Sequence, residues 1–80
     1  MALQYIGKDP ESGKDGSPTV FVDQDNGDLV VQGWIADGST RTGCLESGPI
    51  PDHETVVRVP ARMMAMVKEA CDAAERADVH

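Results

Sequence analysis

The sequence predicts a small α+β domain in which an antiparallel sheet of three or four strands packs against one C-terminal α-helix. Three observations lead to this class: a hairpin signal near the middle of the chain, a helical pattern at its C-terminal end, and a length of 80 residues. A chain of this size is expected to form a single domain, residues 1–80, and to bury only about 60% of the surface that its unfolded form exposes. A protein partner or a second copy would add burial.

The central hairpin is predicted at residues 19–36. Two β-rich runs flank the acidic turn DNGD, residues 25–28. Asn-Gly between apolar runs is the strongest short-range hairpin signal, because both residues tolerate positive φ. As a two-residue turn, it pairs Val22 with Val31.

The remaining elements follow from local composition. Residues 2–6 and 54–59 are rich in apolar and β-branched side chains and are expected to be strands. Residues 7–18 and 37–53 are dense in Gly, Pro, Ser and charged groups and are expected to be loops. The C-terminal helix is predicted at 61–77, where Ala, Met, Glu, Lys and Arg dominate.

One stripe of this helix is apolar and is expected to cover the sheet. Pro60 is placed in its first turn, where a missing N–H costs nothing. The stripe consists of Met63, Val67, Ala70 and Ala74, with Met64 and Cys71 beside it. Met63 and Met64 are expected in the core. Met66 points off the stripe and is the better candidate for contacting a partner.

Alternation along the hairpin divides its side chains between two faces. The face expected to meet the helix carries Val20, Val22, Leu29, Val31 and Ile35, with Gly33 among them. The opposite face carries Thr19, Phe21, Asp23, Asp28, Val30, Gln32 and Trp34. A four-residue loop keeps this assignment, whereas an odd loop or a bulge reverses one strand. Trp34 and Phe21 are thus expected near one another, away from the main core.

Two interpretations of this second face stay open. In the first, the N-terminal strand with Tyr5 and Ile6, or the 37–53 loop, folds over the two aromatic residues. In the second, the aromatic residues form an exposed patch, and such patches mark partner surfaces. On this second interpretation, the partner-binding residues are Phe21, Val30, Gln32, Trp34 and Met66.

The charge balance restricts the class of partner. Seven basic and fourteen acidic residues give a net charge of −7 with neutral histidines. This excludes a generic binder of nucleic acid or anionic membrane, since both need a basic surface. It permits a basic protein partner, although acidity also serves solubility alone. There is no apolar run of about 18 residues and no signal-peptide pattern at the N-terminus, so a cytoplasmic location is expected.

The acidic turn does not match a calcium-binding loop. With Asp23 as the first ligand, Gly27 falls one residue early for the turn glycine of such a loop. Trp34 occupies the position of the bidentate glutamate. A solvated hairpin turn explains the acidic cluster more simply.

The sequence also lacks the residue spacing of other catalytic and metal-binding motifs. The tripeptide DHE at residues 52–54 is contiguous, so its side chains cannot all point into one site on a strand. Cys44, Cys71, His53 and His80 lack the spacing of a zinc site. The chain has no nucleophile elbow, Walker loop or dinucleotide-binding glycine pattern. The sequence therefore predicts no catalytic residues, no metal, no cofactor and no enzymatic activity.

Four segments carry a resemblance to a group of short, acidic actinobacterial proteins. They are YIGKDPES, GSPTVFV, LVVQGW and GPIPDHETVVRVPARM, and the similarity extends from Tyr5 to about Met66. Members of the group often lie beside genes for helix-turn-helix regulators and are similar in size and setting to BldB-like small partner proteins. The resemblance implies a regulatory accessory or an antitoxin-like partner, and it implies no catalytic residues.

Two functional hypotheses follow. The first is a protein–protein interaction module that docks through the Phe21, Val30 and Trp34 face, or through the helix, onto a helix-turn-helix regulator or onto itself as a homodimer. Its acidic surface would complement the regulator's basic DNA-binding side. The second is an acidic inhibitor or antitoxin-like decoy that silences a basic enzyme or toxin. A metal- or small-ligand-binding protein is the least favoured alternative.

Overall fold

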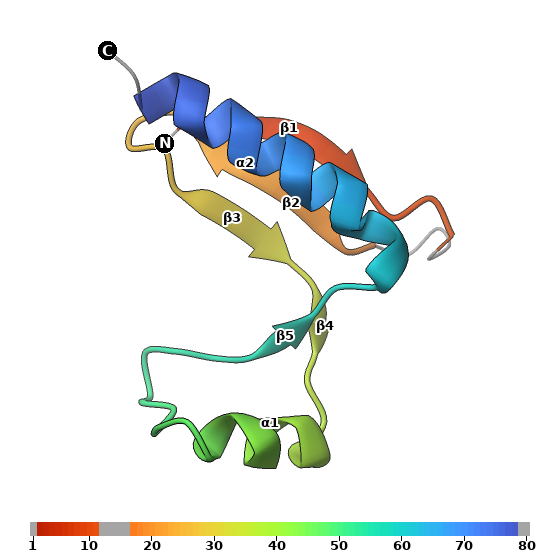
Figure 1. Ribbon diagram of the computed structural model, residues 1–80, viewed down its shortest axis with the longest axis vertical. Helices are drawn as coiled ribbons and strands as arrows, with labels where there is room; N and C mark the ends of the chain where they lie inside the picture. Colours follow the sequence, from red (N-terminus) through yellow and green to blue (C-terminus); the bar gives the residue numbers. More distant parts are fainter. Residues whose placement is uncertain (1, 12–16, 79–80) are drawn as a thin grey trace.

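Three antiparallel strands in the order β1-β2-β3 form the main sheet of the computed structural model, which describes residues 2–11 and 17–78 (Figure 1). They are β1 (Leu3–Lys8), β2 (Thr19–Asp23) and β3 (Leu29–Gln32). The chain then leaves this sheet through β4 (Trp34–Ile35), α1 (Gly38–Leu45) and β5 (Val57–Arg58). It returns through the 3₁₀ turn η1 (Ala61–Met63), which leads into α2 (Met64–Asp78). The predicted α+β class, a small antiparallel sheet with a C-terminal helix, is confirmed.

Two parts of the molecule follow from this path. The body consists of the main sheet, η1 and α2, and the arm consists of residues 33–58. Figure 1 shows the arm projecting from the end of the sheet at which β3 stops. The molecule is elongated as a result, with extents of 39, 30 and 21 Å.

α2 covers one face of the main sheet and packs chiefly on β2 and β1. The core between them is formed by Val20, Val22, Met63, Ala70 and Ala73, with Ile6, Val59, Met66, Val67 and Ala74 packed around it. Full burial of a valine side chain contributes on the order of 1.5 kcal/mol. The predicted helix stripe and the predicted core face of β2 are therefore confirmed. Small side chains in α2 allow the helix to approach the sheet closely.

The β2–β3 connection is a four-residue loop, 24–27, rather than the predicted two-residue turn. The Asp23 N–H donates to the Asp28 carbonyl at 2.8 Å, and the Gly27 N–H donates to the Asp23 carbonyl at 2.8 Å. Side chains accept from the loop backbone, because the Asp25 N–H donates to Asp23 Oδ1 and the Asp28 N–H donates to Asn26 Oδ1, each at 2.9 Å. Gly27 has φ +81°, a left-handed conformation that glycine adopts without strain.

The longer loop shifts the predicted register by two residues. Val22 faces Leu29 and Val20 faces Val31, instead of Val22 facing Val31. Because side chains alternate with a period of two, the assignment of residues to the two faces of β2 and β3 is unchanged. Leu29, expected in the core, is exposed, since α2 lies over β1 and β2 and covers β3 less.

β1 is an edge strand with an irregularity. It pairs Tyr5 with Phe21 and Gly7 with Val20, which leaves Ile6 as an extra residue. This β-bulge directs both Ile6 and Gly7 toward α2. β1 also extends through Lys8, into the segment 7–18 that was predicted as a loop. The part of that loop at 12–16 lies outside the described residues.

Three predicted elements differ from the structure. The segment 37–53 contains the helix α1 rather than being loop throughout. The predicted strand 54–59 is only two residues long and pairs with β4 instead of joining the main sheet. Pro60 lies one residue before η1 with an extended ψ of 147°, not inside the first turn.

Candidate functional site

The face of the main sheet opposite α2 carries a row of apolar side chains that crosses all three strands. Tyr5, Phe21 and Val30 are register partners and therefore project from the same side. The Tyr5 and Phe21 rings meet edge to face, with centroids 6.2 Å apart and planes at 70°, which is a favourable aromatic geometry. Tyr5 leaves 56% of its surface exposed, whereas Phe21 and Val30 are half-buried. We call this surface the open face.

Polar rows flank the apolar row at both ends of the open face. One end carries Lys8 and Gln32 on either side of the buried Thr19, and the other carries Asp23 and Asp28 beside the apolar Leu3. At the first end, Thr19 Oγ1 and Gln32 Nε2 both donate to the Ser17 carbonyl, at 2.8 and 3.0 Å. The open face thus has a basic end, an apolar centre and an acidic end.

The five residues predicted to bind a partner do not form one surface. Phe21, Val30 and Gln32 lie on the open face as the alternation predicted. Met66 does not face outward. It is half-buried against the core, and a Cβ on Gly7 would lie 2.9 Å from its sulfur. Met66 lies beside the predicted stripe, but this side of α2 faces β1, because α2 packs on β1 as well as on β2.

Trp34 belongs to the arm rather than to the hairpin. Its register partner is Arg58 in β5, not a residue of β2. It leaves 45% of its surface exposed. Ile35, predicted in the core, is the largest error of this kind, because 90% of its surface is exposed. The face assignment fails beyond Gln32 because the chain changes its pairing partner there.

Gly33 is the point at which that change occurs. A Cβ at this position would lie 2.6 Å from the Arg58 carbonyl oxygen and 3.2 Å from the Val57 side chain. Real Cβ atoms do not approach backbone oxygen so closely, so only glycine allows β5 to pass at this distance. The glycine therefore fixes where β4 and β5 pair, directly beside the end of β3 (Figure 1).

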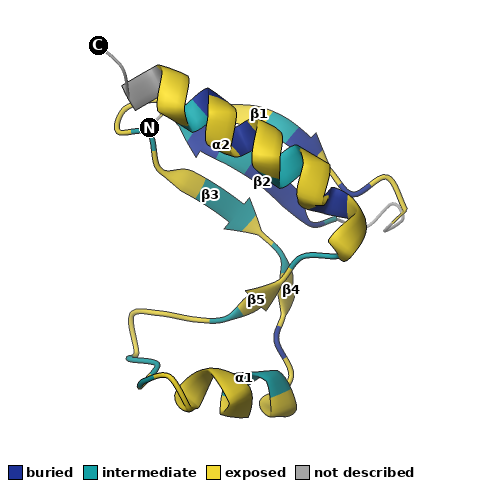
Figure 2. Cartoon of the chain, in the orientation of Figure 1, coloured by how far each residue is buried: buried dark blue, intermediate teal, exposed yellow. Residues whose placement is uncertain are grey.

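α1 is held by capping and not by burial. The Thr40 N–H donates to the N-cap carboxylate of Asp37 at 2.8 Å. Hydrogen bonds from the Thr40 side chain and then its backbone lower the pKa of the Asp37 carboxyl, and the charge of Arg58 adds to this effect. Arg58 Nη1 also donates to Thr40 Oγ1 at 2.6 Å. None of the residues of α1 is buried, and Figure 2 shows that most of the arm is exposed.

The arm presents large apolar side chains to solvent in spite of this lack of a core. They are Trp34, Ile35, Leu45 and Val57. Sequence reasoning selected only the first of these. Ile35 and Val57 were assigned to strands of the main sheet, and Leu45 to a polar loop. Tyr5, the most exposed residue of the apolar row, enters the sequence analysis only as a residue that could cover Phe21 and Trp34.

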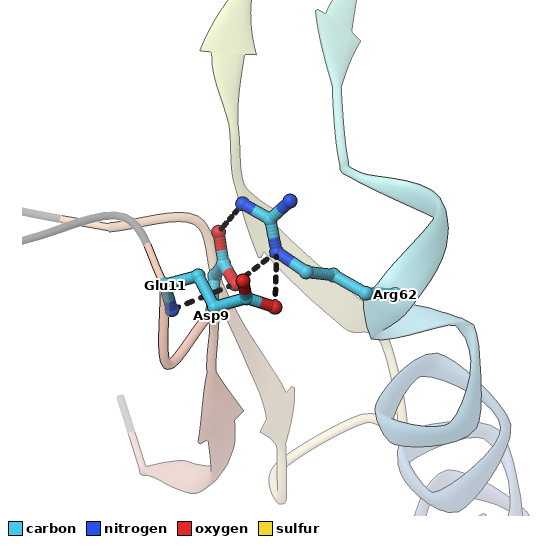
Figure 3. Close-up of polar contacts among 3 residues, drawn as sticks. All are labelled: Asp9, Glu11 and Arg62. Atoms are coloured by element: carbon cyan, nitrogen blue, oxygen red, sulfur yellow. Dashed lines mark hydrogen bonds and ion pairs between the residues drawn. The ribbon is translucent and has the colours of Figure 1, made fainter.

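A partly buried ion pair joins the end of β1 to η1, near the start of α2 (Figure 3). Arg62 donates through Nε and Nη2 to the two carboxylate oxygens of Asp9, at 2.6 and 2.5 Å. The Asp9 side chain is fully buried. The Glu11 N–H donates to Asp9 Oδ1, and the Glu11 carboxylate lies 3.6 Å from Arg62 Nε. The hydrogen bonds to Asp9 raise the pKa of Arg62. Because both charges are paired with each other, we interpret the pair as a connection between β1 and η1.

The residues that could bind a metal or react chemically do not come together in the described part of the chain. No group of three or more His, Cys, Asp or Glu residues there could hold a metal ion. Cys44 and Cys71 are free and exposed. His53 lies 3.7 Å from its neighbour Glu54 in an exposed turn. Met64, expected in the core, is half-exposed at 50%. Among residues 2–11 and 17–78, no helix is long and apolar enough to cross a membrane.

Comparisons with protein-family models, with curated proteins and with solved structures found no match to this chain.

Proposed function

We propose that this protein is a non-enzymatic interaction module that binds a protein partner through its arm. The observation that carries the proposal is the exposure of Ile35, of which 90% is accessible although it lies in a strand. Exposed single apolar residues are ordinary on protein surfaces. Here, however, Ile35 and Val57 are register partners and form one exposed apolar pair on the same side of the β4–β5 ladder. Trp34 is paired with Arg58 and projects from the other side, so both sides of the ladder expose a large apolar side chain. Exposed apolar groups that lie side by side mark interaction sites.

The conformation of the arm is also preorganised in the absence of a partner. The close approach at Gly33, the Asp37 cap and the bond from Arg58 to Thr40 each fix one part of it. An element that is preorganised in this way loses little conformational entropy on binding. A partner would supply the burial that α1 lacks.

The partner class that we propose is a helix-turn-helix regulator, with this protein as its cytoplasmic accessory. Two features support this choice: the resemblance of the chain to proteins found beside such regulators, and the net charge of −7. Acidic surface complements a basic DNA-binding side, which favours encounter and opposes wrong partners.

Capture experiments with arm variants test this proposal. The tagged protein, Ile35→Ser and Trp34→Ala are used as baits in an extract of the native host, and retained proteins are identified by mass spectrometry. We expect the wild type to retain a helix-turn-helix protein and both variants to lose it, since truncating a hot spot costs about 2 kcal/mol or more, roughly a thirtyfold loss. Leu29→Ser, an exposed position on the body, is the matched control.

The distribution of charge favours the acidic decoy as a second candidate. The arm has four acidic and two basic residues, a net charge of −2, so the remaining −5 of the total of −7 lies outside it. A decoy would bind a basic enzyme or toxin mainly through this acidity. Its binding would weaken strongly with added salt and would tolerate Ile35→Ser. Retention of the same basic proteins by all baits, lost at high salt, contradicts the arm proposal and supports the decoy.

A further inference from the structure

We propose that the open face is a self-complementary interface through which two copies of this chain stack sheet on sheet. This inference goes beyond the function proposed for the arm and uses a different surface. Two β-sheets pack face to face at about 10 Å, with their strands nearly aligned. The open face offers what such packing needs, an apolar row formed by Tyr5, Phe21 and Val30 across three strands.

Charge makes this face the suitable one for self-association. Two copies with a net charge of −7 each repel one another, so an interface between them must avoid acidic surface. The open face carries Lys8, Asp23 and Asp28, a net charge of −1. Its charges lie at opposite ends with the apolar row between them.

This arrangement selects the symmetry axis. A two-fold axis that lies between the sheets and runs across the strands exchanges the two ends of the face. It places Lys8 over Leu3 of the second copy, with Asp23 of that copy one strand away, and it places Gln32 opposite Asp28. Each contact then occurs twice. An axis along the strands would instead set Asp23 against Asp23, which is unfavourable.

The partner on the open face is therefore a second copy, because the two-fold axis brings each end of the face against the opposite end of the other copy. The area of the open face determines the expected affinity of the dimer. A standard interface buries about 800 Å² on each partner, and three short strands offer a smaller area. We expect a dimer of micromolar rather than nanomolar affinity.

The first experiment measures mass by sedimentation equilibrium over a range of protein concentrations. We expect the mass to rise from the 8.5 kDa of one chain to twice that value. Tyr5→Asp should weaken the dimer at least about tenfold, because it places a charge in the apolar row. Leu45→Asp, at a similarly exposed position on the arm, should leave the dimer unchanged. A mass of one chain up to about millimolar concentration, or equal behaviour of Tyr5→Asp and wild type, would overturn the proposal.

The second experiment tests the axis by exchanging charges. Lys8→Glu and Asp23→Lys should each weaken the dimer about tenfold, since the axis repeats the new repulsion twice. A mixture of the two variants should dimerise like the wild type, because position 8 of each copy then meets a charge of opposite sign at position 23 of the other. The double variant should also dimerise, for the same reason.

The mixture controls for folding as well. Asp23→Lys removes the carboxylate that accepts from the Asp25 N–H, so this variant alone could lose dimerisation through a disturbed loop. A variant that failed for that reason would not be rescued by Lys8→Glu. Absence of rescue in both the mixture and the double variant, with unchanged circular dichroism, would overturn the proposed axis.

Discussion

The body and the arm are stabilised by different means. In the body, α2 and the sheet enclose fully buried side chains such as Val20, Val22 and Met63. In the arm, a two-residue ladder and a helix with no buried residue are held by caps, one close backbone approach and attachment to the body at both ends. The difference teaches that the free energy of folding resides in the body, so the surface of the arm can serve binding.

Substitutions at neighbouring methionines should show the largest contrast. Met63→Ala should lower the free energy of unfolding by about 3 kcal/mol, because it empties a fully buried site. Met64 is the next residue and is exposed, so Met64→Ala should change the free energy of unfolding by less than about 0.5 kcal/mol. Urea denaturation measures both. Equal effects would show that α2 is rotated about its axis relative to the sheet.

The ion pair between the buried Asp9 and the partly exposed Arg62 should have the next largest effect. Asp9→Asn removes the charge that accepts two hydrogen bonds from Arg62. We expect the free energy of unfolding to fall by about 2 kcal/mol, the value typical of hydrogen bonds to charged groups. Glu11→Gln is the control, since this carboxylate is largely exposed. A loss as large for Glu11→Gln as for Asp9→Asn would contradict the central role of Asp9.

Glycine substitutions test the arm itself. Gly33→Ala should destabilise by about 1–2 kcal/mol, because the new Cβ would meet the Arg58 carbonyl oxygen and push β5 away. Hydrogen exchange should then rise at the Ala36 N–H, which donates to Val56, and stay slow in β2. Gly43→Ala has open space around it and should favour α1 by up to about 1 kcal/mol. Rapid exchange in β2 of Gly33→Ala would show that arm and body unfold together.

The smallest effect concerns pH. The pKa of Asp37 is lowered in the folded state, so its contribution to α1 is complete above the ordinary carboxyl pKa. That contribution is lost as the pH falls through the lowered value. The Thr40 amide shift in NMR spectra should follow this titration, and in Asp37→Asn it should not titrate. A midpoint above the ordinary aspartate value would contradict the capping geometry.

Much of the body could be predicted from sequence because its signals are local. The alternation in β2 and β3 and the stripe of α2 depend on periods of two and 3.6 residues. The division into faces even survived an incorrect loop length, since two and four residues have the same parity. The predicted register was wrong, because the side chains of Asp23 and Asn26 accept hydrogen bonds from the loop backbone and favour the longer loop.

The missed features depend on contacts between distant parts of the chain. The departure of the chain at Gly33 is fixed by Arg58, 25 positions along the sequence. The Asp9–Arg62 pair joins residues 53 positions apart. α1 was overlooked because Gly38 and Gly43 disfavour a helix, although the capping aspartate before it was a visible local signal.

The close approach of Gly33 to Arg58 also means that the arm begins and ends at nearly the same place. Everything between these residues is an insertion whose removal would leave a gap that a short connection can span. The cost of closing such a loop grows only slowly with its length. The arm is therefore a segment that can be exchanged or shortened without changing the elements that form the body. A chain in which a short Gly/Ser linker replaces 34–57 should fold with the core of the body intact.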